Sequence, residues 1–170
     1  MNVELVRVEK EQRSVLRQLM ELYAYDFSEY DRADVNDHGY FGYDYLDHYW
    51  TEPNRHPFFI RVDGKLAGFV LVSDYCSVLQ QAHSWSISEF FVMRKYRRQG
   101  VGKQVAAMVF DMFAGKWEVF QHEANVPSYR FWEVVVQKYT GGCFETVDGV
   151  VDECGDRGRA FIFDASGVSA

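Results

Sequence analysis

Residues 90–110 have the sequence FFVMRKYRRQGVGKQVAAMVF. The segment 87–93 is apolar, and its aromatic and β-branched side chains are typical of a buried strand. A basic turn with two glycines follows at residues 94–103. Beyond it, apolar side chains recur at helical spacing at Val101, Val105, Met108, Val109 and Met112. A strand, a cationic glycine turn and a helix N-terminus in succession predict an anion-binding site.

The basis of this prediction is the first turn of the expected helix. Its N–H groups lack intrahelical partners, and the helix dipole favours negative charge there. Gly100 and Gly102 carry no Cβ atom that would keep a phosphate away from the backbone. An ordinary basic turn between a strand and a helix is the alternative, but the apolar segments on both sides favour the anion site.

Two motifs resemble those of one enzyme family. Residues 97–102, Arg-Arg-Gln-Gly-Val-Gly, fit the pattern Arg/Gln-x-x-Gly-x-Gly/Ala, which resembles the acetyl-CoA-binding motif of the GNAT N-acetyltransferases. Residues 125–132, Asn-Val-Pro-Ser-Tyr-Arg-Phe-Trp, resemble the Asn-x-x-Ala-x-x-Phe-Tyr segment of the same family. The resemblance implies that acetyl-CoA is a co-substrate and that no metal is required.

The resemblance also implies where acetyl-CoA binds. The strand backbone at Phe91, Val92 and Met93 would pair with the pantetheine arm, and Asn125 would hydrogen-bond the same arm. N–H groups of the turn would surround the pyrophosphate, with added charge from two of its side chains. The turn residues in this set are Arg97, Arg98, Gln99, Gly100, Val101, Gly102 and Lys103.

Within the second motif, two positions fit the family and one departs from it. Ser128 stands where a small residue is usual, and Phe131 matches an apolar position near the cofactor. Trp132 stands where many members have a tyrosine that protonates the departing thiolate, and an indole N–H cannot do so. Tyr129 and Tyr139 are candidates for the missing hydroxyl, with packing roles as the alternative. We take Tyr129 as the candidate acid.

The implied reaction needs a group that removes a proton from the amine. An alkyl ammonium has a pKa of about 10.4, so forming the free amine at neutral pH costs roughly 4–5 kcal/mol. Glu89 is the candidate base, because burial among apolar neighbours would raise its pKa, although a solvated strand-end carboxylate is the alternative. The Val92 N–H would polarise the thioester carbonyl. His83 and His122 are further candidates, and surface positions are the alternative for both.

The segment 23–50 is rich in aromatic and acidic residues. It contains seven of the eleven tyrosines, and Arg32 is its single arginine or lysine. The resemblance places this segment beside the acceptor site, where aromatic faces and carboxylates suit a cationic amine. An exposed acidic segment whose tyrosines pack on the sheet is the alternative. The carboxylates are Asp26, Glu29, Asp31, Asp34, Asp37, Asp44 and Asp47.

Periodicity and turn signals predict an alternation of strands and helices. Asp63-Gly64 between two apolar runs predicts a hairpin. The expected strands are 3–8, 58–62, 66–73, 84–93, 117–122, 143–147 and 160–163, and the expected helices are 11–27, 43–50, 100–113 and 127–139, with a loop at 28–42. The resemblance implies an α/β fold, the GNAT acyl-CoA N-acyltransferase fold, whose mostly antiparallel sheet is splayed at its middle strands and flanked by helices.

Composition limits the classes of function. The 170 residues predict a single domain over 1–170, with a core drawn from 48% hydrophobic residues. The net charge of −7 argues against nucleic-acid binding. The absence of a leader and of a long apolar run predicts a cytoplasmic protein without a membrane span. Three cysteines without CxxC spacing predict reduced thiols.

The sequence therefore predicts an acetyl-CoA-dependent N-acetyltransferase that acts on a primary amine of a small molecule or peptide within a ternary complex. A non-catalytic CoA-binding sensor or interaction module is the alternative, and Trp132 keeps it open. A longer acyl group is a third hypothesis. Dimers are common in the family, so a homodimer also stays open.

Overall fold

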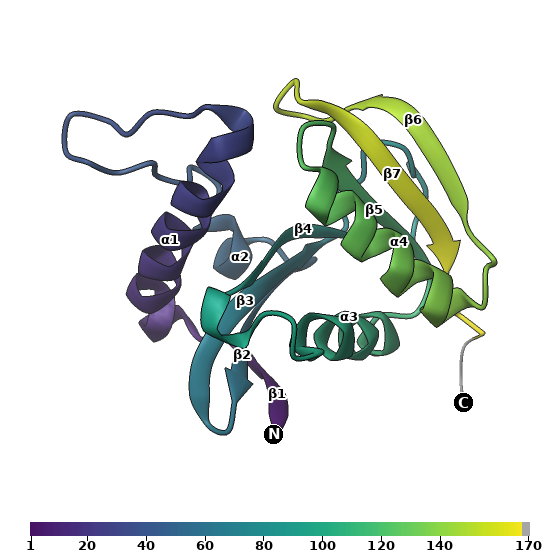
Figure 1. The fold of residues 1–170 in the computed structure, drawn as a ribbon, viewed down its shortest axis with the longest axis horizontal. Coiled ribbons are helices and arrows are strands. Elements are labelled where there is room, and N and C mark those ends of the chain that lie inside the picture. The colour runs from purple at the N-terminus through teal and green to yellow at the C-terminus, as the bar shows by residue number, and fades with distance from the viewer. Residues whose placement is uncertain (168–170) are drawn as a thin grey trace.

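A mixed sheet forms the centre of the protein, which we describe from a computed structural model covering residues 1–167 (Figure 1). The described strands follow the order β1-β2-β3-β4-β5-β7-β6. Their bounds are β1 Val3–Arg7, β2 Arg55–Val62, β3 Lys65–Ser73, β4 Ser84–Val92, β5 Lys116–His122, β6 Glu145–Val151 and β7 Arg157–Asp164. The helices are α1 Arg13–Asp31, α2 His48–Thr51, α3 Val101–Met112 and α4 Val126–Thr140, with 3-10 turns η1 Lys10–Gln12 and η2 Arg94–Tyr96. The predicted mixed α/β sheet is confirmed; residues 168–170 of the predicted domain lie outside the described part.

The middle of the sheet opens between β4 and β5. These strands are parallel and pair from Ser84 to Ser86 with Lys116 to Glu118, whereas the other neighbouring strands are antiparallel. Beyond Ser86 the two strands diverge, and β4 continues to Val92 with β3 alone as its partner. The predicted splay at the middle strands is therefore present.

Apolar side chains on both faces of the sheet are buried by helices. On one face, Ile60 and Val70 pack with the inward faces of α3 and α4. On the other face, Phe69 and Leu71 pack beneath α1 and α2. Because successive side chains of a strand point to opposite faces, β2 and β3 have nearly continuous apolar sequences. Figure 1 shows α4 lying along β5 and β7.

The predicted hairpin is confirmed at Asp63 and Gly64. Val62 pairs directly with Lys65, so the turn has two residues. Both turn residues have positive φ, 49° and 76°, which suits the twist of an antiparallel pair. None of the helices in the described part of the chain is long and apolar enough to cross a membrane.

Five elements differ from the sequence prediction by three or more residues at one end. β2 and β7 each begin three residues earlier than expected, at Arg55 and Arg157. α1 extends to Asp31 and ends where Arg32 adopts a left-handed conformation, so the first four residues of the expected loop 28–42 are helical. The helix expected at 43–50 is reduced to α2 and preceded by turns. β6 begins later and runs further than expected, because its polar residues Asp148 and Gly149 form a bulge on an edge strand.

Gly68 allows β3 and β4 to approach closely. A Cβ atom at this position would lie 1.9 Å from the backbone oxygen of Phe91, a contact that cannot exist without a backbone shift. Gly68 pairs with Val92 across the strands, so it also fixes the end of β4 that borders the splay. A glycine is therefore required here by contact with the neighbouring backbone.

We expect Gly68→Ala to lower the free energy of unfolding by about 2–3 kcal/mol, because a methyl group has no space between these strands. Urea denaturation measures the change. Gly167→Ala is the control, since among residues 1–167 no atom outside its chain neighbours lies within 4 Å of the added methyl. Equal stabilities of the two variants would contradict the prediction.

Candidate functional site

A basic groove with a volume of about 630 Å³ follows the open edge of β4. Its walls come from the second half of α1, the end of β4, the glycine turn and the first turns of α4. Among its described lining residues, four are basic and two are acidic: Arg94, Arg97, Arg98 and Lys103 against Asp26 and Glu29.

An acidic cavity of about 370 Å³ lies beside it. Its walls come from the end of α1 and the loop after it, the middle of β4, the end of β5 and the β6–β7 turn. The carboxylates that line it are Asp31, Asp34, Glu89, Asp152 and Asp156. Within residues 1–167, no lysine or arginine lines this cavity.

The two hollows meet where β4 and β5 separate. Phe90, Asn125, Ser128 and Trp132 line both of them, as do two aromatic residues of α1. A ligand lying in the basic groove therefore reaches the edge of the acidic cavity at this junction. The arrangement can hold an anion and a cation on opposite sides of one reaction point.

The glycine turn places two residues with positive φ just before the N-terminus of α3. Gly100 precedes α3 with φ 84°, a conformation that favours glycine. Arg98 also has a positive φ of 60°. At Gly102 an added Cβ would lie 3.1 Å from the ring of Phe131, so this glycine allows α3 to contact α4.

The end of β4 presents alternate backbone groups to the groove. The Met93 N–H donates to the Ala67 oxygen of β3 at 2.8 Å, so this residue faces β3. Because hydrogen bonding alternates along an antiparallel strand, the N–H and C=O of Val92 face the opposite way. The Val92 oxygen accepts a hydrogen bond from Arg97 Nε at 2.6 Å, which agrees with this orientation.

Asp26 of α1 holds two arginines of the turn. Its Oδ2 lies 2.6 Å from Arg97 Nη2, and its Oδ1 lies 2.8 Å from Arg94 Nη2. Burial favours a higher pKa, but hydrogen bonds from Arg97 and Arg94 outweigh it, so the pKa of Asp26 lies below its usual value. An internal carboxylate thus already neutralises part of the turn.

Most of the residues predicted to bind acetyl-CoA line the basic groove. Three of them do not, as far as the described chain extends. Met93 uses its N–H in the sheet. Val101 is buried in the core. The Gln99 side chain donates to the Lys95 oxygen. Those at the groove are Phe91, Val92, Arg97, Arg98, Gly100, Gly102, Lys103, Asn125, Ser128 and Phe131.

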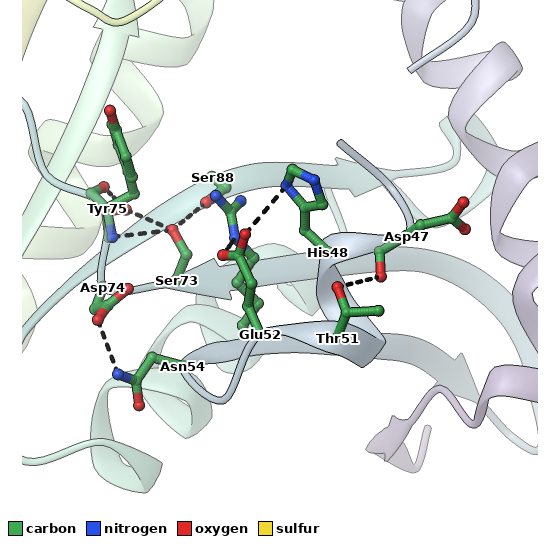
Figure 2. Close-up of polar contacts among 11 residues, drawn as sticks. Asp47, His48, Thr51, Glu52, Asn54, Ser73, Asp74, Tyr75 and Ser88 are labelled. Carbon is green, nitrogen blue, oxygen red and sulfur yellow. Dashed lines mark hydrogen bonds and ion pairs between the residues drawn. The ribbon is translucent and has the colours of Figure 1, made fainter. Parts of the chain in front are cut away.

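Glu89 lines the acidic cavity directly after an irregularity in β4. Leu71 pairs with Glu89 while Val72 pairs with Ile87, which leaves Ser88 as the extra residue of a bulge. The Ser88 hydroxyl lies 2.8 Å from the Ser73 hydroxyl, which also accepts the Tyr75 N–H, as Figure 2 shows. The bulge therefore has a side-chain anchor in β3.

Burial raises the pKa of Glu89 to about 7, and the hydroxyl groups of Tyr23 and Tyr43 partly offset this effect. The negative charge of Asp152 acts in the same direction as burial. Burial and Glu89 in turn raise the pKa of both tyrosines. A carboxyl group with a pKa near neutrality can accept a proton in one step and release it in the next.

The outer wall of the acidic cavity is tied to α1 by Glu21. Its two carboxylate oxygens accept the N–H groups of Phe41 and Gly42, each at 2.9 Å. These two residues line the cavity. One side chain therefore fixes the loop after α1 over the site.

The predicted catalytic role of Tyr129 does not fit its position. Its ring stacks on Phe161 at 5.3 Å, and its hydroxyl is directed to Glu133. Within the described chain it lines neither hollow, because it lies on the face of α4 that packs against β7. Tyr139 likewise donates to Asp111 elsewhere on the surface. Neither hydroxyl is at the junction.

The histidine candidates are separated by the fold. His122 lines the acidic cavity, its ring packing edge-on against Phe27 and its Nε2 lying 3.9 Å from Asp156. His83 is exposed before β4 and, among the described residues, lines neither hollow. Trp132 is 4% exposed and packs edge-on against Phe90 and Phe131.

Part of the lining of both hollows carries no local sequence signal. The β6–β7 turn, with Asp152 and Asp156, comes from a distant part of the chain, and no local motif marks it. Gln121 of β5 lines the acidic cavity and has an ordinary strand sequence around it. The contact of Asp26 with the turn could not be predicted, because the acidic segment was interpreted either as an acceptor wall or as an exposed segment, and in neither case as a partner of the arginines. In residues 1–167, no three His, Cys, Asp or Glu side chains are grouped so as to hold a metal ion.

The family is shown by comparison with a sequence model. The model for the acetyltransferase (GNAT) family matches residues 16–134, which include most of α1, the splayed strands and the first half of α4. The chain belongs to this family of acyltransferases. Comparison with curated protein sequences finds no significant match.

Solved structures share the fold at low sequence identity. An acetyltransferase from Thermus thermophilus has a TM-score of 0.71 and 11% identity, with 96% of this chain and 97% of that chain covered. The aminoglycoside acetyltransferase AAC(6')-Ib in complex with coenzyme A has a TM-score of 0.69 and 11% identity over 96% and 95%. PaiA N-acetyltransferase from Thermoplasma acidophilum, also with coenzyme A, has a TM-score of 0.63 and 11% identity over 96% and 99%.

The raised pKa of Glu89 predicts a dependence of stability on pH. The folded protein holds a proton on Glu89 up to about pH 7, whereas the unfolded chain loses it near 4.5. Stability therefore falls as pH rises through this window, by up to about 3 kcal/mol. The glutamine of Glu89→Gln cannot ionise, so the variant does not lose this stability. The free energy of unfolding of the variant minus that of the parent should therefore be larger at about pH 8 than at about pH 5, by up to about 3 kcal/mol.

Urea denaturation of both proteins at the two pH values measures this difference, because other titrating groups are common to both and cancel. Glu145→Gln, at an exposed position of β6, is the control and should show no such change. If the two proteins differ in stability by the same amount at both pH values, the pKa of Glu89 is the same in the folded and the unfolded protein, and the prediction is wrong.

Proposed function

We propose that the protein transfers the acetyl group of acetyl-CoA to a primary amine of a small molecule or peptide, by direct attack within a ternary complex. The observation that carries this proposal is the junction of the basic groove and the acidic cavity beside Glu89. A polyanionic donor and a cationic acceptor would meet there from opposite sides. Membership of the acetyltransferase family supports the same reaction.

The groove has the charge and backbone groups for coenzyme A, which is present in the structures of two similar acetyltransferases. The first-turn N–H groups of α3, with Arg98 and Lys103, would hold the pyrophosphate. The outward-facing backbone of Val92 would pair with the pantetheine arm. Asn125 caps α4 through its Oδ1, which accepts the Ser128 N–H, and this leaves the side-chain amide nitrogen for the same arm.

In the proposed reaction, Glu89 takes a proton from the incoming ammonium, directly or through a water molecule. The amine nitrogen then bonds to the thioester carbon while the Val92 N–H stabilises the negative charge on the carbonyl oxygen. The carbon–sulfur bond breaks, and the electron pair leaves on the thiolate of coenzyme A. The second proton of the amine nitrogen passes to this thiolate or to water, so that a neutral amide is released. Ser128 and the N-terminus of α4, which border both hollows, stabilise this thiolate in place of a tyrosine hydroxyl.

We expect Gly100→Glu to weaken binding of coenzyme A at least a hundredfold, because a carboxylate would occupy the space of the pyrophosphate. Isothermal titration calorimetry measures the affinity. Gly141→Glu is the matched control: Gly141 also has a positive φ, 63° against 84°, and ends α4 away from the groove. If Gly100→Glu bound coenzyme A as tightly as Gly141→Glu, the assignment of the turn would be wrong.

Release of free thiol from acetyl-CoA in the presence of primary amines tests the reaction itself. The parent should show a rise of kcat/KM with pH whose midpoint is near 7, set by Glu89. Glu89→Gln should lower kcat by a factor of about 10²–10³, and its kcat/KM should no longer rise with a midpoint near pH 7. Cofactor binding without thiol release on any amine would favour the non-catalytic CoA-binding module, for which Trp132 at the tyrosine position is the supporting observation.

A further inference from the structure

The charges of the acidic cavity exceed what one amine needs. Glu89 directly precedes Phe90, which lines both hollows, but four more carboxylates line the same cavity. Asp31 and Asp34 come from the end of α1 and the loop after it, and Asp152 and Asp156 come from the β6–β7 turn. With no lysine or arginine in this lining over residues 1–167, these charges attract a cation from solution.

A buried side chain gives a second, independent sign of a ligand. Gln121 is 3% exposed, and its Nε2 donates to the Val119 oxygen at 2.5 Å. That contact fixes the orientation of the amide, because the oxygen end would be repelled by a carbonyl. Within the described chain, Gln121 Oε1 then has no hydrogen-bond partner, although it belongs to a residue that lines the cavity. A buried, unpaired carbonyl oxygen is costly, and an N–H donor of a ligand would satisfy it.

Aromatic faces in the same cavity suit the same kind of ligand. Tyr23, Phe27, Phe41 and Phe120 line the cavity together with the carboxylates. Their rings attract ammonium groups and accommodate the carbon chain or ring that links them. The cavity therefore combines hydrogen-bond acceptors, negative charge and apolar surface in one lining.

Resting on the proposed function, we infer that the amine acceptor carries at least two ammonium groups. The reacting group lies at the junction, beside Glu89. A second group lies deeper in the acidic cavity, whose lining includes Gln121 and the carboxylates Asp34 and Asp156. Linear polyamines and amino sugars share this chemistry. A monoamine occupies the junction but leaves these two carboxylates without a counter-charge.

Steady-state acetyl transfer with matched pairs of acceptors tests the inference and distinguishes the two sources. The linear pair is spermidine and 1-aminobutane, and the sugar pair is kanamycin and glucosamine. We expect kcat/KM to be at least tenfold higher for the polycation of one pair or both, and this ratio to fall as salt screens the charges. Equal kcat/KM values within both pairs would overturn the inference while leaving the proposed function intact.

The double variant Asp34→Asn/Asp156→Asn should reduce the preference for the polycation at least tenfold. Asp37→Asn/Asp44→Asn is the matched control, because both aspartates are exposed in the same region and, in residues 1–167, neither lines the cavity. An unchanged preference in the first double variant would contradict the role of these carboxylates. Far-ultraviolet circular dichroism checks that both variants are folded.

Calorimetry of the parent without acetyl-CoA separates this inference from the proposed function. Spermidine or kanamycin should bind at least tenfold more tightly than its monoamine partner, even if no acetyl transfer occurs. Tighter binding without transfer would overturn the proposed function and retain the dicationic site. Equal binding of polycations and monoamines would overturn the inference regardless of activity.

Discussion

The hydrogen bonds between β4 and β5 stop after three residue pairs, and the remaining structure depends on this interruption. Beyond it, two strand edges carry polar backbone groups inside the protein, where leaving them unpaired is costly. Nearby side chains satisfy some of these groups: Arg97 Nε donates to the Val92 oxygen, and Gln121 Nε2 donates to the Val119 oxygen. The basic groove and the acidic cavity follow from the same divergence, since each occupies one side of the gap.

The basic groove and the acidic cavity separate the charges that line the two hollows, as the proposed anionic donor and cationic acceptor would require. Trp132, buried beneath Phe90 and Phe131, forms the apolar wall at their meeting point. An apolar wall keeps water away from the junction and strengthens the electrostatic interactions there. In this position a tryptophan contributes shape and low polarity rather than a proton, and α4 contributes the positive end of its dipole.

The sequence predicted the elements whose apolar pattern is strong and local. Both motifs, the Asp63-Gly64 hairpin and the buried strands β2 to β5 were recovered, because turn chemistry and apolar runs mark them directly. β6 was misplaced since its polar edge residues hide the strand, and the end of α1 was missed because acidic residues there resemble a loop. Tyr129 was taken as the candidate acid because it is a tyrosine near Trp132, although not at the motif position, but only the rotation of α4 determines which face its ring occupies. Asp152 and Gln121 could not be found, because long-range packing brings them to the site.

The tie from Asp26 to Arg94 and Arg97 has a consequence for what the turn accepts. Arg94 and Arg97 are already paired with a carboxylate of α1. An anion that binds them must therefore compete with Asp26 and not only with water. A small ion such as inorganic phosphate gains little from displacing Asp26. A long ligand that also extends along Val92 and reaches Asn125 gains additional contacts along its length. If the turn binds coenzyme A as proposed, the tie would favour a long ligand over simple anions that match the turn in charge alone.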